Sequence, residues 1–220
     1  MHETSVPLWQ PSAQRLASSH ITAFSRLAQT VWGQPLPNYD SLWQASITHL
    51  DHFWSLVWDY TGVIGDKGQT LLNLGDTMRK TRFFPEARLN YAENILRYQG
   101  THPAIFFQGE DETRREWDWD TLHAKVSRLQ QAMQTMGIVA GDRVAGFMPN
   151  IPETVAAMLA ATSLGAIWTS TSPEFGSESA LDRFSQTTPK LLFCPDGYWY
   201  NGKLIDIRDK VIHIAEQLST

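Results

Sequence analysis

Residues 141–176 read GDRVAGFMPNIPETVAAMLAATSLGAIWTSTSPEFG and carry the clearest pattern of secondary structure in the sequence. Its pattern predicts a strand over 143–148, a helix over 152–164 with proline in the first turn, and a strand over 167–171. The helix is rich in alanine, whose small side chain lets a helix lie close to a sheet, and Gly165 ends it with little steric cost. A strand, a helix and a second strand in this order predict parallel strands joined by a right-handed crossover.

The alternation of strands and helices continues on both sides of this stretch. Strands alternating with helices favour an α/β fold with a parallel sheet, and the first strand pair reads as a hairpin with a charged turn. The flanking elements are predicted as strands over 104–108, 113–117 and 191–194, and as helices from Asp120 as N-cap through Met136 and over 177–185.

The first hundred residues have helical periodicity and long connections instead. We therefore divide the chain into a mainly helical part, residues 1–100, and an α/β part, residues 101–220. Within the first part the pattern predicts one helix over 12–32 and a second helix from a cap at Asp40 or Ser41 through Val57. An extended arm is predicted over 82–85, because the residue before a proline avoids the helical region. A short helix capped by Asn90 is predicted to run through Leu96.

Composition places the chain among globular proteins. Of its 220 residues 42% are hydrophobic and 19% charged, and the net charge of −5 gives no sign of a nucleic-acid or anionic-membrane partner. The lone cysteine, Cys194, has no internal disulfide partner, which favours a reducing compartment, and we expect it to be a buried apolar side chain. Met1–Thr4 lacks the basic start of a signal peptide and no run reaches ~18 apolar residues, so the expected location is cytoplasmic.

A run of hydroxyl side chains, Thr169–Ser172, ends the strand predicted over 167–171. Ligands of open parallel sheets bind beyond the carboxyl ends of strands, so this run is a candidate binding segment. It is followed by Pro173, which has no N–H, and by Glu174, which repels phosphate, so it is not a triphosphate loop. The sequence contains neither GxxxxGK[ST] nor GxGxxG.

Other candidate centres are weaker. His49 and His52 lie three residues apart and could share a metal, but no third ligand is evident and a structural pair is favoured. No serine stands in a nucleophile elbow. We therefore assign no metal ligand and no catalytic residue.

Residues 141–176 resemble the adenylate-forming superfamily of acyl-CoA synthetases. The segment Arg82–Asn94 is similar to an arm of acetyl-CoA and acetoacetyl-CoA synthetases, although tryptophan often stands there in place of Phe83 and glycine in place of Glu86. The segment from Leu181 through Lys203, with DGYWYNGK at its end, most resembles the acetoacetyl-CoA synthetase family. With Trp9–Ser12, the resemblance covers nearly the whole chain.

The resemblance implies a fold and a reaction. The fold is a partial parallel-sheet AMP-binding domain of the acyl-adenylate-forming type, over 101–220, preceded by a helical N-terminal extension over 1–100. The reaction is that of an acetoacetate–CoA ligase: ATP and a carboxylate form an acyl-adenylate and pyrophosphate, and CoA then displaces AMP to give the thioester. Such enzymes have roughly three times this length, so the chain corresponds to an N-terminal portion.

The family's catalytic groups have no counterpart in the sequence. Its phosphate loop ending in lysine, its adenine- and magnesium-facing segment, its ribose-binding aspartate and its late lysine are all missing from residues 1–220. Adenylation needs cations to neutralise the phosphates and a rigid pocket to align the carboxylate. We therefore expect ATP and magnesium to act only in a full-length enzyme and this chain to be inactive alone.

The resemblance leaves a partial CoA surface in this chain. In acetyl-CoA synthetase relatives the loop that matches Ser172, Pro173 and Glu174 lies against CoA, and basic residues near positions 200 and 203 meet its phosphates. Lys203 keeps a cation, whereas Tyr200 replaces what is often arginine. A solvated lysine in a turn is the alternative for Lys203.

Two interpretations of the chain as a whole stay open. One is an inactive N-terminal fragment of the ligase. The other is a non-catalytic remnant or interaction module that assembles with a separate chain carrying the missing motifs. In both, small molecules are the ligands of the complete enzyme, and a sheet with unpaired edges predicts poor solubility or self-association.

Overall fold

The structure, a computed structural model, describes residues 8–218; residues 1–7, 219 and 220, and with them the Met1–Thr4 segment, lie outside the described residues. The chain divides into two compact units, Met1–Arg88 and Leu89–Thr220, each with a core of its own. The two units are described separately.

The first unit has a helical core stabilised by aromatic side chains. The ring of Phe24 meets the rings of Phe53 and Tyr60 edge-on, with centroids 5.7 and 5.2 Å apart. Edge-to-face pairs of this kind add to the free energy gained from burial. The elements are α1 (Ala13–Ala17), α2 (His20–Trp32), α3 (Tyr39–Thr48), α4 (Leu50–Thr61), β1 (Gly65–Asp66), β2 (Leu72–Asn73), a 3₁₀ turn (Met78–Lys80), β3 (Arg82–Phe83) and, at the boundary of the units, β4 (Arg88–Leu89).

The two long helices predicted for this unit are each divided in two. The prediction of one helix over 12–32 was wrong because the Ser19 hydroxyl accepts from the backbone N–H of Thr22 at 3.3 Å and starts a new helix. The prediction of a cap at Asp40 or Ser41 was also wrong: Asn38 is the N-cap of α3 and forms a capping box with Ser41. A further break follows at His49, where φ is −123° and ψ is 64°.

The arm over 82–85 is extended only in part. Arg82 and Phe83 form β3, but Phe84 has a φ of 45°, in the left-handed region. Its N–H donates to the carbonyl of Leu71 at 2.9 Å, and its ring lies 5.2 Å from that of Trp58. These contacts compensate for a backbone conformation that is costly for a bulky residue.

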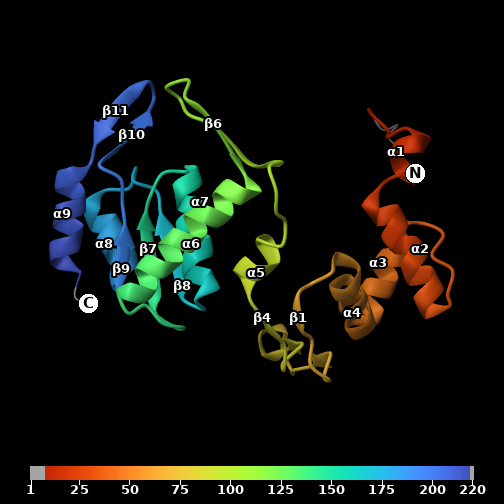
Figure 1. The fold of residues 1–220 in the computed structure, drawn as a ribbon. Coiled ribbons are helices and arrows are strands. Elements are labelled where there is room, and N and C mark those ends of the chain that lie inside the picture. Colours follow the sequence, from red (N-terminus) through yellow and green to blue (C-terminus); the bar gives the residue numbers. More distant parts are fainter. Residues whose placement is uncertain (1–7, 219–220) are drawn as a thin grey trace, which may run out of the picture. The chain divides into compact units, whose positions relative to one another are not determined.

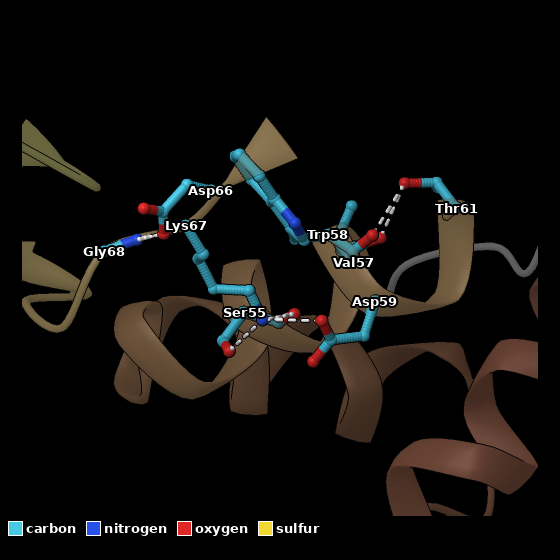
Figure 2. Close-up of polar contacts among 8 residues, drawn as sticks. All are labelled: Ser55, Val57, Trp58, Asp59, Thr61, Asp66, Lys67 and Gly68. Carbon is cyan, nitrogen blue, oxygen red and sulfur yellow. Dashed lines mark hydrogen bonds and ion pairs between the residues drawn. The ribbon is translucent and has the colours of Figure 1, made fainter. Parts of the chain in front are cut away.

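Lys67 ties the segment after β1 to α4 (Figure 2). Its ammonium nitrogen lies 2.6 Å from a carboxylate oxygen of Asp59 and donates to the hydroxyl and the carbonyl of Ser55 at 3.1 and 3.3 Å. Only 20% of the Lys67 side chain is exposed, so the ion pair holds a largely covered charge. Nearby, the N–H of Gly68 donates to Asp66 at 2.9 Å.

The second unit is built on a parallel sheet with the strand order β8-β7-β9. Helices α6 and α7 cover one face of the sheet and α8 and α9 cover the other (Figure 1). Side chains alternate along β7: Val144 faces the core on the α6–α7 side, whereas Ala145 and Phe147 face the α8–α9 side. All three are fully buried, which confirms the predicted α/β class and parallel sheet.

The elements of this unit follow the predicted order closely. The N-cap of α6 is Asp118, which accepts from the N–H of Thr121 at 2.7 Å, so the prediction of Asp120 was wrong. The helix predicted after Asn90 is confirmed. The elements are α5 (Tyr91–Ile95), β5 (Pro103–Gln108), β6 (Arg114–Asp118), α6 (Trp119–Thr135), β7 (Arg143–Phe147), α7 (Pro152–Ser163), β8 (Ile167–Thr171), α8 (Ser177–Ser185), β9 (Leu191–Phe193), β10 (Gly197–Tyr200), β11 (Lys203–Asp206) and α9 (Arg208–Gln217).

Small side chains pack α7 against its neighbours as predicted. The four alanines of its buried face are each at most 1% exposed: Ala156, Ala157, Ala160 and Ala161.

Cys194 is exposed, contrary to prediction. The last residue of β9 is Phe193, so Cys194 lies just beyond the strand, outside the alternation that buries strand side chains. Partial desolvation still raises the pKa of its thiol.

Candidate functional site

A cavity of about 780 Å³ lies at the carboxyl ends of β7 and β8. This is the edge at which open parallel sheets bind ligands. Four segments line the cavity: the β5–β6 hairpin from Phe107 to Arg115, the residues that follow β7, those that end and follow β8, and strand β10.

The structure brings four of the five predicted site residues together. Ser172, Pro173, Glu174 and Tyr200 all line the cavity, although they lie up to 28 positions apart in the sequence. Pro173 is fully buried and anchors its loop, whereas Glu174 is exposed. The fifth residue, Lys203, is exposed and does not line the cavity. It opens β11 and pairs with Tyr200 across the hairpin.

Carboxylates outnumber cations in the lining. Glu110, Asp111 and Glu174 contribute negative charge, and Arg115 contributes the positive charge among the lining residues. The Arg115 guanidinium is held by both oxygens of Glu153, at 2.5 and 3.1 Å, and its carbon lies 4.8 Å from the Phe107 ring centroid. Because that cation is already paired, the lining favours an uncharged section of a ligand over a phosphate group.

Two groups in the lining have shifted pKa values. The Thr113 hydroxyl donates to Asp111 at 2.7 Å and is the main cause that lowers the pKa of that carboxyl. Burial raises the pKa of Tyr198, and the nearby charge of Glu174 raises it further. At neutral pH Asp111 is therefore ionised and the Tyr198 phenol is a neutral hydrogen-bonding group.

Two hairpin tips meet at the rim of the cavity. The N–H of Gly202, in the β10–β11 turn, donates to a carboxylate oxygen of Glu110 at 3.3 Å. Asn201 and Gly202 have φ values of 50° and 71°, both left-handed, as a tight two-residue hairpin turn requires. Sequence reasoning missed this hairpin and the helix α9 after it, although the Asn-Gly pair is a strong hairpin signal.

Arg183, in α8, contacts Ser179 and Phe175 rather than Asp182 or Glu178, the acidic residues near it in the sequence. Its guanidinium donates to the carbonyl and the hydroxyl of Ser179 at 2.9 and 2.6 Å, and it lies 4.5 Å from the ring centroid of Phe175. Glu178 lies 2.9 Å from His213 instead.

Neither a metal centre nor a membrane span is found in the part of the chain that the structure describes. Residues 8–218 contain no group of three His, Cys, Asp or Glu side chains placed to hold a metal ion. Within the same residues no helix is long and apolar enough to cross a bilayer.

Comparison with known proteins identifies the family. The sequence profile described as AMP-binding enzyme matches residues 92–219, more than half of the chain. The chain belongs to this family. The matched residues contain the parallel sheet, its covering helices and the whole cavity lining.

Among the AMP-binding enzymes, the relatives that this chain matches include several acetoacetyl-CoA synthetases. The acetoacetyl-coenzyme A synthetase of Rhizobium meliloti (strain 1021) is 48% identical over 96% of this chain and 33% of its own length. That of Xenopus tropicalis is 36% identical over 96% of this chain and 32% of its own. The solved acetoacetyl-CoA synthetase from Streptomyces lividans matches 97% of this chain and 34% of its own, with 39% identity and a TM-score of 0.91.

The chain thus spans about a third of the length of the curated relatives it matches. The predicted resemblance to an N-terminal portion of an acetoacetyl-CoA synthetase is confirmed by these matches.

Proposed function

We propose that this chain is the N-terminal portion of an acetoacetate–CoA ligase and is inactive by itself. In this proposal residues 1–100 are the helical N-terminal extension and residues 101–220 are the first part of the AMP-binding domain. The observation that carries it is the match over 96% of this chain but 33% of a relative called acetoacetyl-coenzyme A synthetase. The absence of a glycine-rich phosphate loop ending in lysine from the printed sequence supports the inactivity.

We assign the cavity at the carboxyl ends of β7 and β8 to part of CoA. Its volume of about 780 Å³ falls in the range of small-molecule sites. Its carboxylates disfavour phosphate, so the uncharged pantetheine section of CoA is the part that suits the lining beside Ser172, Pro173, Glu174 and Tyr200. We assign Lys203, which is exposed and lies outside the lining, to the nucleotide phosphates of CoA.

ATP and magnesium belong to the complete enzyme in this proposal. ATP supplies the adenylyl group that activates the carboxylate, with pyrophosphate as the leaving group, and magnesium neutralises the charge of the phosphates. The residues described here contribute the sheet on which the rest of the domain builds its site.

The test is pyrophosphate release from ATP, magnesium and acetoacetate. The purified 220-residue chain is expected to release none above a no-protein control, whereas a full-length relative releases pyrophosphate under the same conditions. Pyrophosphate release by this chain alone would overturn the inactivity.

The alternative, a module that assembles with a separate chain, is a second arm of that test. Adding a separately purified C-terminal two-thirds of the Rhizobium meliloti relative restores release under the alternative. No release from the mixture, with intact activity of the uncut relative, removes it.

The Lys203 assignment has a test of its own. Lys203→Ala is expected to weaken CoA binding in calorimetry and to leave binding of pantetheine unchanged. An unchanged CoA affinity would favour the alternative, in which Lys203 is a solvated lysine in a turn.

A further inference from the structure

The loop from Ser172 to Gly176 carries Glu174 into the cavity lining, and its backbone is held from a distant helix. Lys210 lies in the first turn of α9, and its ammonium nitrogen donates to the carbonyl of Pro173 at 2.9 Å and to that of Phe175 at 3.1 Å. These two carbonyls flank Glu174 in the sequence. One ammonium group therefore binds the peptide unit that precedes Glu174 and the peptide unit that follows Phe175.

The geometry of the loop fits this clamp. The N–H of Phe175 donates to the carbonyl of Ser172 at 3.2 Å, which closes a turn around Pro173 and Glu174. Loop carbonyls of this kind need partners, and an ammonium group offers three donors. The Phe147 ring, 5.8 Å from the Lys210 nitrogen, adds a cation–π contact beneath it.

We propose that Lys210 is the positioning residue of this loop and sets the turn that presents Glu174 to the cavity. Its role in binding rests on the proposed function, which assigns CoA to the cavity. Its role in the loop is independent of that assignment, because it depends only on the contacts of the ammonium group. Lys210 does not line the cavity itself.

The competing explanation is that Lys210 only helps to pack α9 against the rest of the unit. A variant at another position of α9 serves as a matched control. His213, one turn further along α9, contacts Glu178 of α8 at 2.9 Å. His213→Gln therefore disturbs a polar tie between α9 and α8 and leaves the Pro173 and Phe175 carbonyls alone.

The experiment is amide hydrogen exchange of the 220-residue chain without CoA, in Lys210→Met, Lys210→Arg and His213→Gln. We expect the Phe175 amide to exchange about tenfold faster in Lys210→Met, close to wild type in Lys210→Arg, and as in wild type in His213→Gln, with β7 amides unchanged throughout. An unchanged Phe175 amide in Lys210→Met overturns the proposal. So does an equal acceleration in β7 or in His213→Gln, because either marks a loss of packing rather than of a clamp.

CoA affinity, measured by calorimetry on the same proteins, forms the second arm. Lys210→Met is expected to weaken binding about tenfold and Lys210→Arg to retain it. Failure of the wild-type chain to bind CoA would sink the proposed ligand, while the exchange result would still decide the role of Lys210.

Discussion

Residues 89–218 and residues 8–88 bury their apolar side chains in different ways. The first of these regions packs two helical layers on a three-stranded parallel sheet, with small residues where the layers are closest. The other packs helices through large aromatic rings such as Phe24 and Phe53, and its strands have two residues each. The described site residues and the cavity that they line belong to the first region.

The two regions differ in the substitutions that they can tolerate. Where a helix meets a neighbouring layer through alanine, a larger side chain does not fit, so replacing the alanine lowers the free energy of unfolding. A parallel sheet also aligns the ends of its strands at one edge, which places the loops after β7 and β8 beside one cavity. The helical region has no such edge, and its polar contacts serve its own stability.

Phe184→Ala is expected to have the largest effect. Phe184 is 1% exposed and meets the ring of Phe147 edge-on at 6.4 Å, so truncation leaves a cavity in the sheet core. Denaturant unfolding should show a loss of about 3–5 kcal/mol for residues 89–220. Phe106→Ala, at a position 75% exposed, is the control and should cost under about 0.5 kcal/mol. Equal losses would mean that the sheet core is not where stability resides.

Ala160→Leu tests whether the alanine face of α7 is closed to larger side chains. Ala160 is fully buried, so the added atoms force its neighbours apart at a cost of about 1–3 kcal/mol in unfolding free energy. Ala124→Leu, on the exposed face of α6, should be close to neutral. A neutral Ala160→Leu would contradict the close packing of the layers.

Lys67→Met tests the polar tie of the helical region. It removes a largely covered ion pair with Asp59 and should lower the stability of residues 8–88 by about 1 kcal/mol, discounted because Asp59 is 62% exposed. Lys80→Met breaks an exposed pair with Asp76 and should change stability by under about 0.5 kcal/mol. If both variants lose the same amount, the tie in Figure 2 has no special role.

Asp118→Ala and Asp120→Ala separate two candidate caps of α6. Asp118 accepts from the N–H of Thr121, so its loss should cost about 1 kcal/mol in thermal unfolding. Asp120 accepts from the N–H of Gly100 instead, and Asp120→Ala should cost less. A larger loss from Asp120→Ala would restore the cap expected from the sequence.

The smallest expected effect is on the free energy of unfolding at acidic pH. Hydrogen bonds from Arg208 lower the pKa of Asp206 from 3.8 to about 2. Since the folded pKa is lowered, the stabilisation is present above pH 3.8 and is lost as the pH falls toward about 2. Asp206→Asn and Arg208→Ala should flatten the same part of the profile, measured by unfolding at each pH. A profile that neither variant changes would contradict the pairing.

The sheet region was predictable from the sequence and the helical region only in part. Periodicity and glycine identified the strands and helices from β5 to β9 to within two residues. In the helical region the apolar periodicity runs on across Ser19 and His49, where the backbone breaks. At Ser19 a capping side chain decides the break, and apolar periodicity does not detect it.

The sequence predicted which residues of the loop after β8 belong to the candidate site, but not the contacts between distant segments that complete the site. Ser172, Pro173 and Glu174 follow β8, so their place at the sheet edge follows from topology. The exclusion of Lys203 from the lining depends on the β10–β11 register, and the clamp by Lys210 depends on a missed helix. Contacts across 37 residues follow from packing rather than from local pattern.

The most direct test of a CoA site in this chain is hydrogen exchange of the wild-type chain with and without CoA. We expect CoA to slow exchange in the segments that line the cavity, around residues 107–115, 148–154, 170–174 and 197–200, and to leave residues 8–88 unchanged. Protection confined to residues 8–88, or no protection in the lining segments at saturating CoA, would contradict this expectation.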